Sequence, residues 1–190
     1  MFCISINHKN TPADVRERFA FTTKGQRQFT ERLKAEVGGC VVLSTCNRME
    51  IYFTDKYEQV EKLLANDRNV PVSLIRRYSM NYEGFQCVLH LCRVACGMDS
   101  MVLGEVEIIH QVKSAYLMAK ELGACDGELN IAFQGALAAA KAVATESDAT
   151  RLPISVGTLS AREAVNFTRN GGIENTCRDV RSDVVSSSQV

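Results

Sequence analysis

The sequence predicts an α+β fold in which a layer of strands and helices precedes a wholly helical segment. Runs of β-branched and aromatic residues occur up to Tyr82, whereas apolar residues at helical spacing dominate from residue 83 onward. The chain has 190 residues, of which 46% are hydrophobic and 23% charged, so it can bury a core and has an ordinary globular composition. We therefore expect three or four strands with helices on one face, followed by a helical segment.

The N-terminal part of the chain alternates between short strands and helices. Residues 2–6 alternate in polarity and predict the first strand. Thr11 as N-cap and Pro12 at the first helical position then predict a helix start. The remaining elements predicted here are helices at 12–20 and 25–37, strands at 40–45 and 49–54, helices at 56–66 and 72–77, and a strand at 78–82.

The rest of the chain is predicted to be helical. On residues 84–97, apolar side chains cover most of the helix, and Gln86, His90, Arg93 and Gly97 fall together on one side. A narrow polar strip on an apolar helix predicts a buried helix that lines a site. The alternative is that His90 is a hydrogen-bonded core histidine. Further helices are predicted at 105–122, 126–146 and 153–167, with a break at 148–153.

Charge, hydropathy and cysteine usage exclude several classes of protein. Basic and acidic residues balance at 22 each, so any RNA contact must come from a local patch. No apolar run approaches the roughly 20 residues of a membrane span, and the N-terminus lacks the pattern of a secretory signal. Eight cysteines without a Cys-x-x-Cys pair, and only three histidines, argue against a metal site. We expect a cytoplasmic chain with reduced cysteines.

Residues 44–50, with the sequence Ser-Thr-Cys-Asn-Arg-Met-Glu, join the second and third predicted strands. Cys46 then falls at a bend, where a side chain is held rigidly and can be exposed. Thr45, Asn47, Arg48 and Glu50 surround it with a hydroxyl, an amide, a cation and a carboxylate. A nearby guanidinium favours the thiolate, which is the nucleophilic form of cysteine, or could bind a substrate carboxylate. The alternative is that Cys46 is a buried structural cysteine.

Three segments of the chain resemble glutamyl-tRNA reductases, in the order in which that family carries them. They are Ile6–Lys9, Ser44–Glu50 and His90–Glu105, the last continuing through Ile108 to Lys113. The resemblance covers roughly residues 1–165 and implies that residues 1–150 form the family's N-terminal catalytic domain, a ferredoxin-like α/β sandwich followed by a helical segment. It implies that residues 151–168 begin a linker helix toward an NADP-binding domain. Residues 169–190 read as a polar tail, disordered or truncated.

The resemblance implies an NADPH-dependent oxidoreductase of tetrapyrrole (porphyrin) biosynthesis. The thiolate of Cys46 would attack the glutamyl ester of charged tRNA, and NADPH would reduce the thioester to glutamate-1-semialdehyde. His90 is the second implied catalytic residue, suited to proton transfer or to positioning near the ester. The substrate contacts implied by motif position are Thr45, Asn47, Arg48, Ser100, Glu105, Val106, Glu107 and Gln111. Val106 stands where the family pattern has a polar residue or proline.

The sequence contains no Gly-x-Gly-x-x-Gly phosphate loop. We therefore expect this chain to form the thioester and hydrolyse it slowly as a glutamyl-tRNA esterase, without reducing it. Expected partners are glutamyl-tRNA and, as a candidate, glutamate-1-semialdehyde aminomutase. The family forms a homodimer through a C-terminal domain that this sequence lacks, so we expect a monomer.

Two alternatives to catalysis stay open. One is a non-catalytic module that binds glutamyl-tRNA or a reductase partner, and the other is an inactive fragment. The intact motif around Cys46 argues against the inactive fragment. A Cys46→Ser variant separates catalysis from binding.

Overall fold

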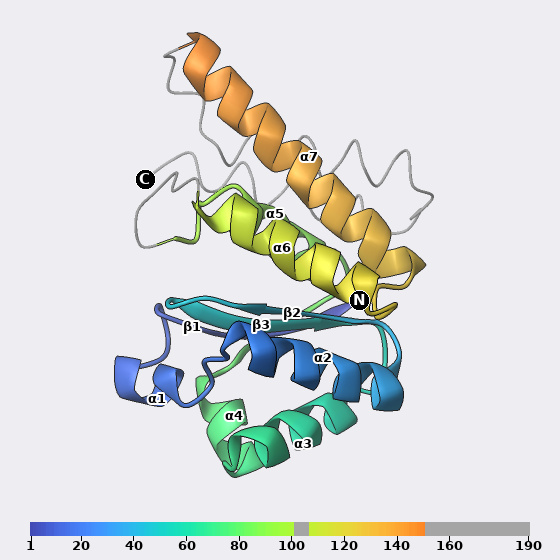
Figure 1. Ribbon diagram of the computed structural model, residues 1–190. Helices are drawn as coiled ribbons and strands as arrows, with labels where there is room; N and C mark the ends of the chain where they lie inside the picture. Colours follow the sequence, from blue (N-terminus) through green and yellow to red (C-terminus); the bar gives the residue numbers. More distant parts are fainter. Residues whose placement is uncertain (101–106, 151–190) are drawn as a thin grey trace.

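Four antiparallel strands form the central sheet of the protein, which a computed structural model describes over residues 1–100 and 107–150 (Figure 1). The strands are β1 (Phe2–Asn7), β2 (Cys40–Ser44), β3 (Arg48–Phe53) and β4 (Met80–Glu83). Their order in the sheet is β2-β3-β1-β4. Together with the helices between them, this is the ferredoxin-like arrangement, so the predicted fold class is confirmed.

Seven helices accompany the sheet in the described residues. They are α1 (Ala13–Glu17), α2 (Thr23–Val37), α3 (Tyr57–Arg68), α4 (Val72–Tyr78), α5 (Gly84–Ala95), α6 (Glu107–Glu121) and α7 (Gly127–Thr150). None of them combines the length and apolar character that crossing a membrane requires.

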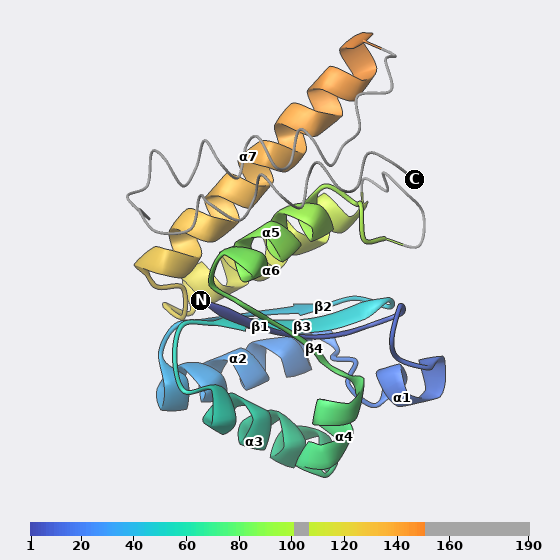
Figure 2. The same ribbon diagram turned by 180° about the vertical axis from the view of Figure 1, so that it is seen from behind.

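Both faces of the sheet are covered by helices. α2, α3 and α4 lie on one side, whereas α5 and α6 lie on the other with α7 packed outside them (Figures 1 and 2). All six residues of β3 are consequently buried. Its polar positions, Arg48 and Glu50, are therefore buried as well.

The register of the sheet gathers polar side chains on the face toward α5. Ser5 lies opposite Glu50, Asn7 opposite Arg48, and Cys3 opposite Tyr52. Because side chains alternate between the two faces of a strand, these residues share one face. The other face of β1 and β3 is apolar, with Ile4, Ile6, Met49, Ile51 and Phe53. The polar face therefore has to satisfy its hydrogen bonds inside the protein.

Two predicted helix ends were wrong. α1 is shorter than predicted, and Thr11 does not cap it, because its Oγ1 donates to the backbone oxygen of Tyr78 at 3.1 Å. α7 continues through Asp148 to Thr150, where a break had been expected. Aspartate within a helix costs only a few tenths of a kcal/mol, so this residue does not end a long helix. The helix predicted at 153–167 and the tail at 169–190 lie outside the described residues.

Candidate functional site

Cys46 lies at the tip of the hairpin that joins β2 to β3. The backbone N–H of Thr45 donates to the backbone oxygen of Arg48 at 2.8 Å. The Thr45 hydroxyl accepts from the backbone N–H groups of Asn47 and Arg48, at 3.2 Å each. These bonds hold the turn in place, and Cys46 is exposed. The prediction that Cys46 lies at an exposed bend is confirmed, and the interpretation of Cys46 as a buried structural cysteine is wrong.

Glu50 lies at the centre of a buried polar network between the sheet and α5. Its carboxylate accepts from Ser5 Oγ at 2.8 Å, Arg48 Nη1 at 3.0 Å and the Tyr52 hydroxyl at 2.6 Å, and lies 2.9 Å from His90 Nε2. Burial alone raises the pKa of Glu50, but the charge and hydrogen bond of His90, together with Arg48 and Tyr52, lower it to about 2. Glu50 is therefore an ionised, fully paired carboxylate.

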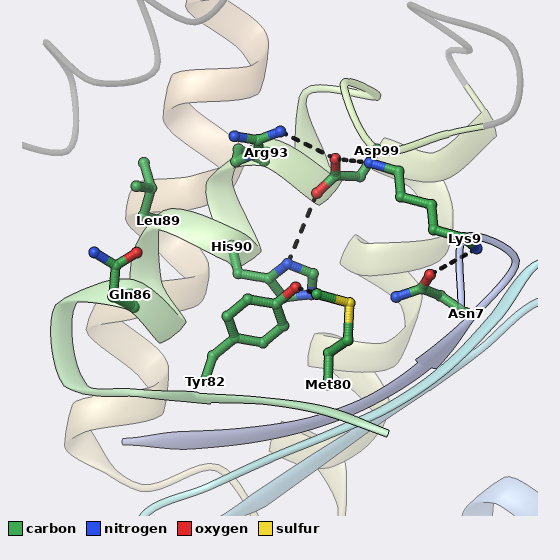
Figure 3. Close-up of a pocket in the computed structure, with 9 residues that line it drawn as sticks. All are labelled: Asn7, Lys9, Met80, Tyr82, Gln86, Leu89, His90, Arg93 and Asp99. Atoms are coloured by element: carbon green, nitrogen blue, oxygen red, sulfur yellow. Dashed lines mark hydrogen bonds and ion pairs between the residues drawn. The ribbon is translucent and has the colours of Figure 1, made fainter. Parts of the chain in front are cut away.

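Asp99 is the second acidic centre of the site. It receives Lys9 Nζ and, at 3.3 Å, Arg93 Nη2 on one carboxylate oxygen, and its other oxygen lies 3.7 Å from His90 Nδ1. Arg48 Nη2 also donates to the backbone oxygen of Asp99. Burial raises the pKa of Asp99, but its bonds to Lys9 and Arg93 outweigh burial and lower it. His90 is thus held between two carboxylates, as Figure 3 shows on the Asp99 side.

A cavity of about 270 Å³ opens beside this network (Figure 3). It is lined by Asn7, Lys9, Met80, Tyr82, Gln86, Leu89, His90, Arg93 and Asp99. The predicted polar strip of α5 therefore does line a pocket, through Gln86, His90 and Arg93. Tyr82 stacks on His90 with ring centroids 4.0 Å apart. The side chains of Lys9 and Arg93 are 48% and 47% exposed, so both cations can meet an anionic ligand.

The predicted substrate residues that the structure describes fall into three groups. Thr45 and Asn47 flank Cys46 at the hairpin tip. Arg48 is only 2% exposed, and it is engaged by Glu50 and Asp99 rather than pointing at solvent. The third group comprises Ser100, which follows Asp99 directly, and Glu107 and Gln111 on α6. Among the described residues, no hydrogen bond or ion pair joins Glu107 or Gln111 to the hairpin. Glu105 and Val106 lie outside the described residues.

Sequence reasoning missed four residues that the structure brings to the site. Glu50, Asp99 and Lys9 stand inside the recognised motifs, but none of them was assigned as a catalytic or substrate-binding residue. The spacing of Arg48 and Glu50 by two residues along a strand was the available signal for an ion pair on one face. Arg16 was not considered, because its bond to Cys46 joins residues far apart in the sequence.

One buried group of potential metal ligands lies in the described part of the chain. Ligand atoms of Cys3, Glu50 and His90 lie within 4.8 Å of one another. Burial, together with a hydrogen bond that the Cys3 thiol donates to Cys87 and the charge of Glu50, raises the pKa of Cys3 well above its ordinary value, which keeps its thiol protonated. The guanidinium of Arg48 also occupies the same carboxylate. The chemistry of this cluster therefore disfavours a cation.

Comparison with known proteins shows which family this chain belongs to. The family described as "Glutamyl-tRNAGlu reductase, N-terminal domain" matches residues 4–147. The chain belongs to this family. The resemblance drawn from the three motifs is thus confirmed, and the hairpin of Cys46 and the pocket beside His90 both lie within the matched range.

Individual glutamyl-tRNA reductases agree with this assignment. The protein of Desulforudis audaxviator is 39% identical over 159 residues, covering 80% of this chain and 36% of the relative. That of Akkermansia muciniphila is 38% identical over 171 residues, covering 86% and 50%. The solved structure of glutamyl-tRNA reductase from Methanopyrus kandleri matches with a TM-score of 0.62 and 26% identity, over 87% of this chain and 46% of that one. The chain thus spans half or less of the length of these relatives.

Proposed function

We propose that Cys46 attacks the glutamyl ester of charged tRNA, the acyl-transfer step of glutamyl-tRNA reduction. The observation that carries this proposal is an exposed cysteine at the tip of a rigid hairpin, within the motif that resembles the family's active site. In the reaction, a bond forms between Sγ and the carbonyl carbon, and the ester C–O bond to the tRNA breaks. The terminal ribose hydroxyl leaves with a proton, and a glutamyl thioester remains on Cys46.

The pocket beside His90 is the proposed place of the glutamyl group. Lys9 and Arg93 at its rim can balance a negative charge of the substrate. His90, held between Glu50 and Asp99, is oriented for proton transfer or for positioning near the ester. Arg48 contributes through its bonds to Glu50 and Asp99. The other substrate contacts in the proposal are Thr45, Asn47, Ser100, Glu105, Val106, Glu107 and Gln111.

NADPH does not fit the described residues. Their sheet is wholly antiparallel, whereas a dinucleotide-binding fold has parallel strands and a Gly-rich turn. The proposal therefore assigns reduction of the thioester by NADPH, the oxidoreductase step of tetrapyrrole biosynthesis, to residues other than 1–100 and 107–150. A polypeptide of these 190 residues is expected to form the thioester and hydrolyse it slowly without producing glutamate-1-semialdehyde.

The proposal also includes a cellular compartment and the partners of the protein. A reducing cytoplasm would keep the exposed thiol of Cys46 free for catalysis. Glutamyl-tRNA is the proposed macromolecular partner. Glutamate-1-semialdehyde aminomutase, which would receive the aldehyde product, is a candidate second partner. The 190-residue polypeptide is expected to be a monomer.

The experiment is to mix the polypeptide with radiolabelled glutamyl-tRNA, quench in acid and map the label, with and without NADPH. We expect label on Cys46 and no semialdehyde in either sample. Cys46→Ser should lose the label and keep tRNA binding in a gel shift. Cys125→Ser, which alters a half-buried thiol on another loop, is the matched control and should be labelled like the parent.

Two results would contradict this proposal. Label that persists in Cys46→Ser would place the nucleophile elsewhere. Retained tRNA binding by a folded parent without any label would instead support the binding-module alternative.

A further inference from the structure

A cation from α1 is bonded to the hairpin tip that carries Cys46. Nε of Arg16 donates to the backbone oxygen of Cys46 at 3.2 Å. Nη1 of the same guanidinium donates to the backbone oxygen of Thr11 at 3.1 Å. The planar guanidinium thus bridges the hairpin tip and the loop before α1, in the fixed geometry that distinguishes arginine from lysine.

The Thr11 end of this bridge is firmly anchored. Thr11 is 4% exposed, and its hydroxyl donates to the backbone oxygen of Tyr78 at 3.1 Å. The side-chain amide of Asn10 donates to the same oxygen at 2.8 Å. α1, by contrast, buries none of its residues. Arg16 therefore transmits the rigidity of the anchored loop, rather than that of a packed helix, to the backbone of Cys46.

Arg48, the cation that the sequence predicts beside Cys46, is bonded to the interior of the protein instead. It is 2% exposed and is bonded to Glu50 and to the backbone of Asp99. Arg16 places a positive charge at the hairpin tip, since its guanidinium is bonded to the backbone oxygen of Cys46. The positive charges near the hairpin also affect His8, whose backbone N–H donates to the backbone oxygen of Asn47 at 3.0 Å. Burial lowers the pKa of His8, and the charges of Arg48, Lys9 and Arg16 lower it further.

We propose that Arg16 is a positioning residue for the nucleophile Cys46, holding its backbone and supplying positive charge beside the thiolate. This inference rests on the proposed acyl transfer. Because a displacement of about 1 Å can slow a reaction about 100-fold, the bridge matters for the geometry of attack. The charge is a separate contribution, which lysine could also supply.

The test compares Arg16→Gln, Arg16→Lys and the control Arg18→Gln. Arg18 is exposed on the same segment and carries the same charge, so its loss has the same long-range effect on tRNA. We measure the single-turnover rate of Cys46 acylation, the affinity for charged tRNA, and the alkylation rate of Cys46 by iodoacetamide at low salt. Circular dichroism confirms that each variant is folded.

We expect Arg16→Gln to slow acylation about 10- to 100-fold with little change in tRNA affinity, and to slow alkylation about two- to fivefold. Arg16→Lys should restore alkylation, because the charge is kept, but not acylation, because the two-carbonyl bridge is lost. Arg18→Gln should behave like the parent in both reactions.

Unchanged acylation and alkylation in Arg16→Gln would overturn the proposal. Slow acylation that follows weaker tRNA affinity, with normal alkylation, would also overturn it and would make Arg16 an RNA contact. If the parent is never acylated, the proposed function fails, whereas alkylation still decides whether Arg16 acts on Cys46.

Discussion

At the scale of single residues, the buried carboxylate of Glu50 organises the site. Its pKa of about 2 lies below the ordinary value of 4.5. A depressed carboxylate pKa means that the ionised group stabilises the fold above about pH 4.5, and that this stabilisation is lost as the pH falls toward 2. The cause is specific pairing, because burial alone would act in the opposite direction.

We predict that Glu50→Gln lowers the free energy of unfolding at pH 7 by about 3–5 kcal/mol, since Arg48 is left as a buried, unpaired charge. At pH 3 the difference from the parent should shrink to roughly half, because the parent itself has lost part of the stabilisation. Urea unfolding at both pH values measures this. Glu31→Gln, at an exposed carboxylate, is the control and should leave both midpoints unchanged. A difference that is the same at pH 7 and pH 3 would contradict the assigned pKa.

At the scale of elements, α5 has two functions on different faces. Leu91 is fully buried, whereas Leu89 lines the cavity and is half-buried. We predict that Leu91→Ala costs about 2–5 kcal/mol of stability and that Leu89→Ala costs less than half as much. Leu89→Ala should instead raise the concentration of glutamyl-tRNA that is needed for half of the maximal acylation rate. Equal stability losses in urea unfolding of the two variants would show that the cavity wall is ordinary core.

At the scale of the whole molecule, the helical segment and the sandwich share one core. The fully buried Phe133 of α7 packs edge-on against Tyr52 of β3 at 5.2 Å between ring centroids and stacks on Tyr116 of α6 at 5.8 Å. The N-terminal ammonium of Met1 also bonds to Glu128 at 2.8 Å. The layers are therefore expected to unfold together.

We predict that Phe133→Ala lowers the free energy of unfolding by about 3–5 kcal/mol. The far-UV and near-UV circular dichroism of this variant should still change in one transition. Denaturant unfolding followed by both signals tests this. The control is Ile131→Ala, two residues away on the same helix, where an exposed side chain is truncated and little change is expected. Separate transitions in the parent would mean that α5–α7 form an independent unit.

Much of the fold and part of the site could be predicted because they depend on local patterns. The strands around Cys46, the exposed bend between them and the polar strip of α5 follow from alternation, turn residues and helical spacing. The left-handed Gly97 after α5 (φ 72°) also follows from its residue type. The ends of α1 and α7 could not be predicted, because Thr11 found a tertiary partner in Tyr78 and because Asp148 lies within a long helix.

The sequence by itself determined the α+β class, the family, and Cys46 as the candidate nucleophile, since these rest on motifs of neighbouring residues. Only the tertiary structure decided which cations act where. It turned Arg48 inward to Glu50 and Asp99, brought Arg16 to the backbone of Cys46, and set His90 between two carboxylates. The physical reason is that a buried charge must find its partner across the sheet or on another helix. Such pairings depend on strand register and helix packing, which periodicity along one chain does not specify.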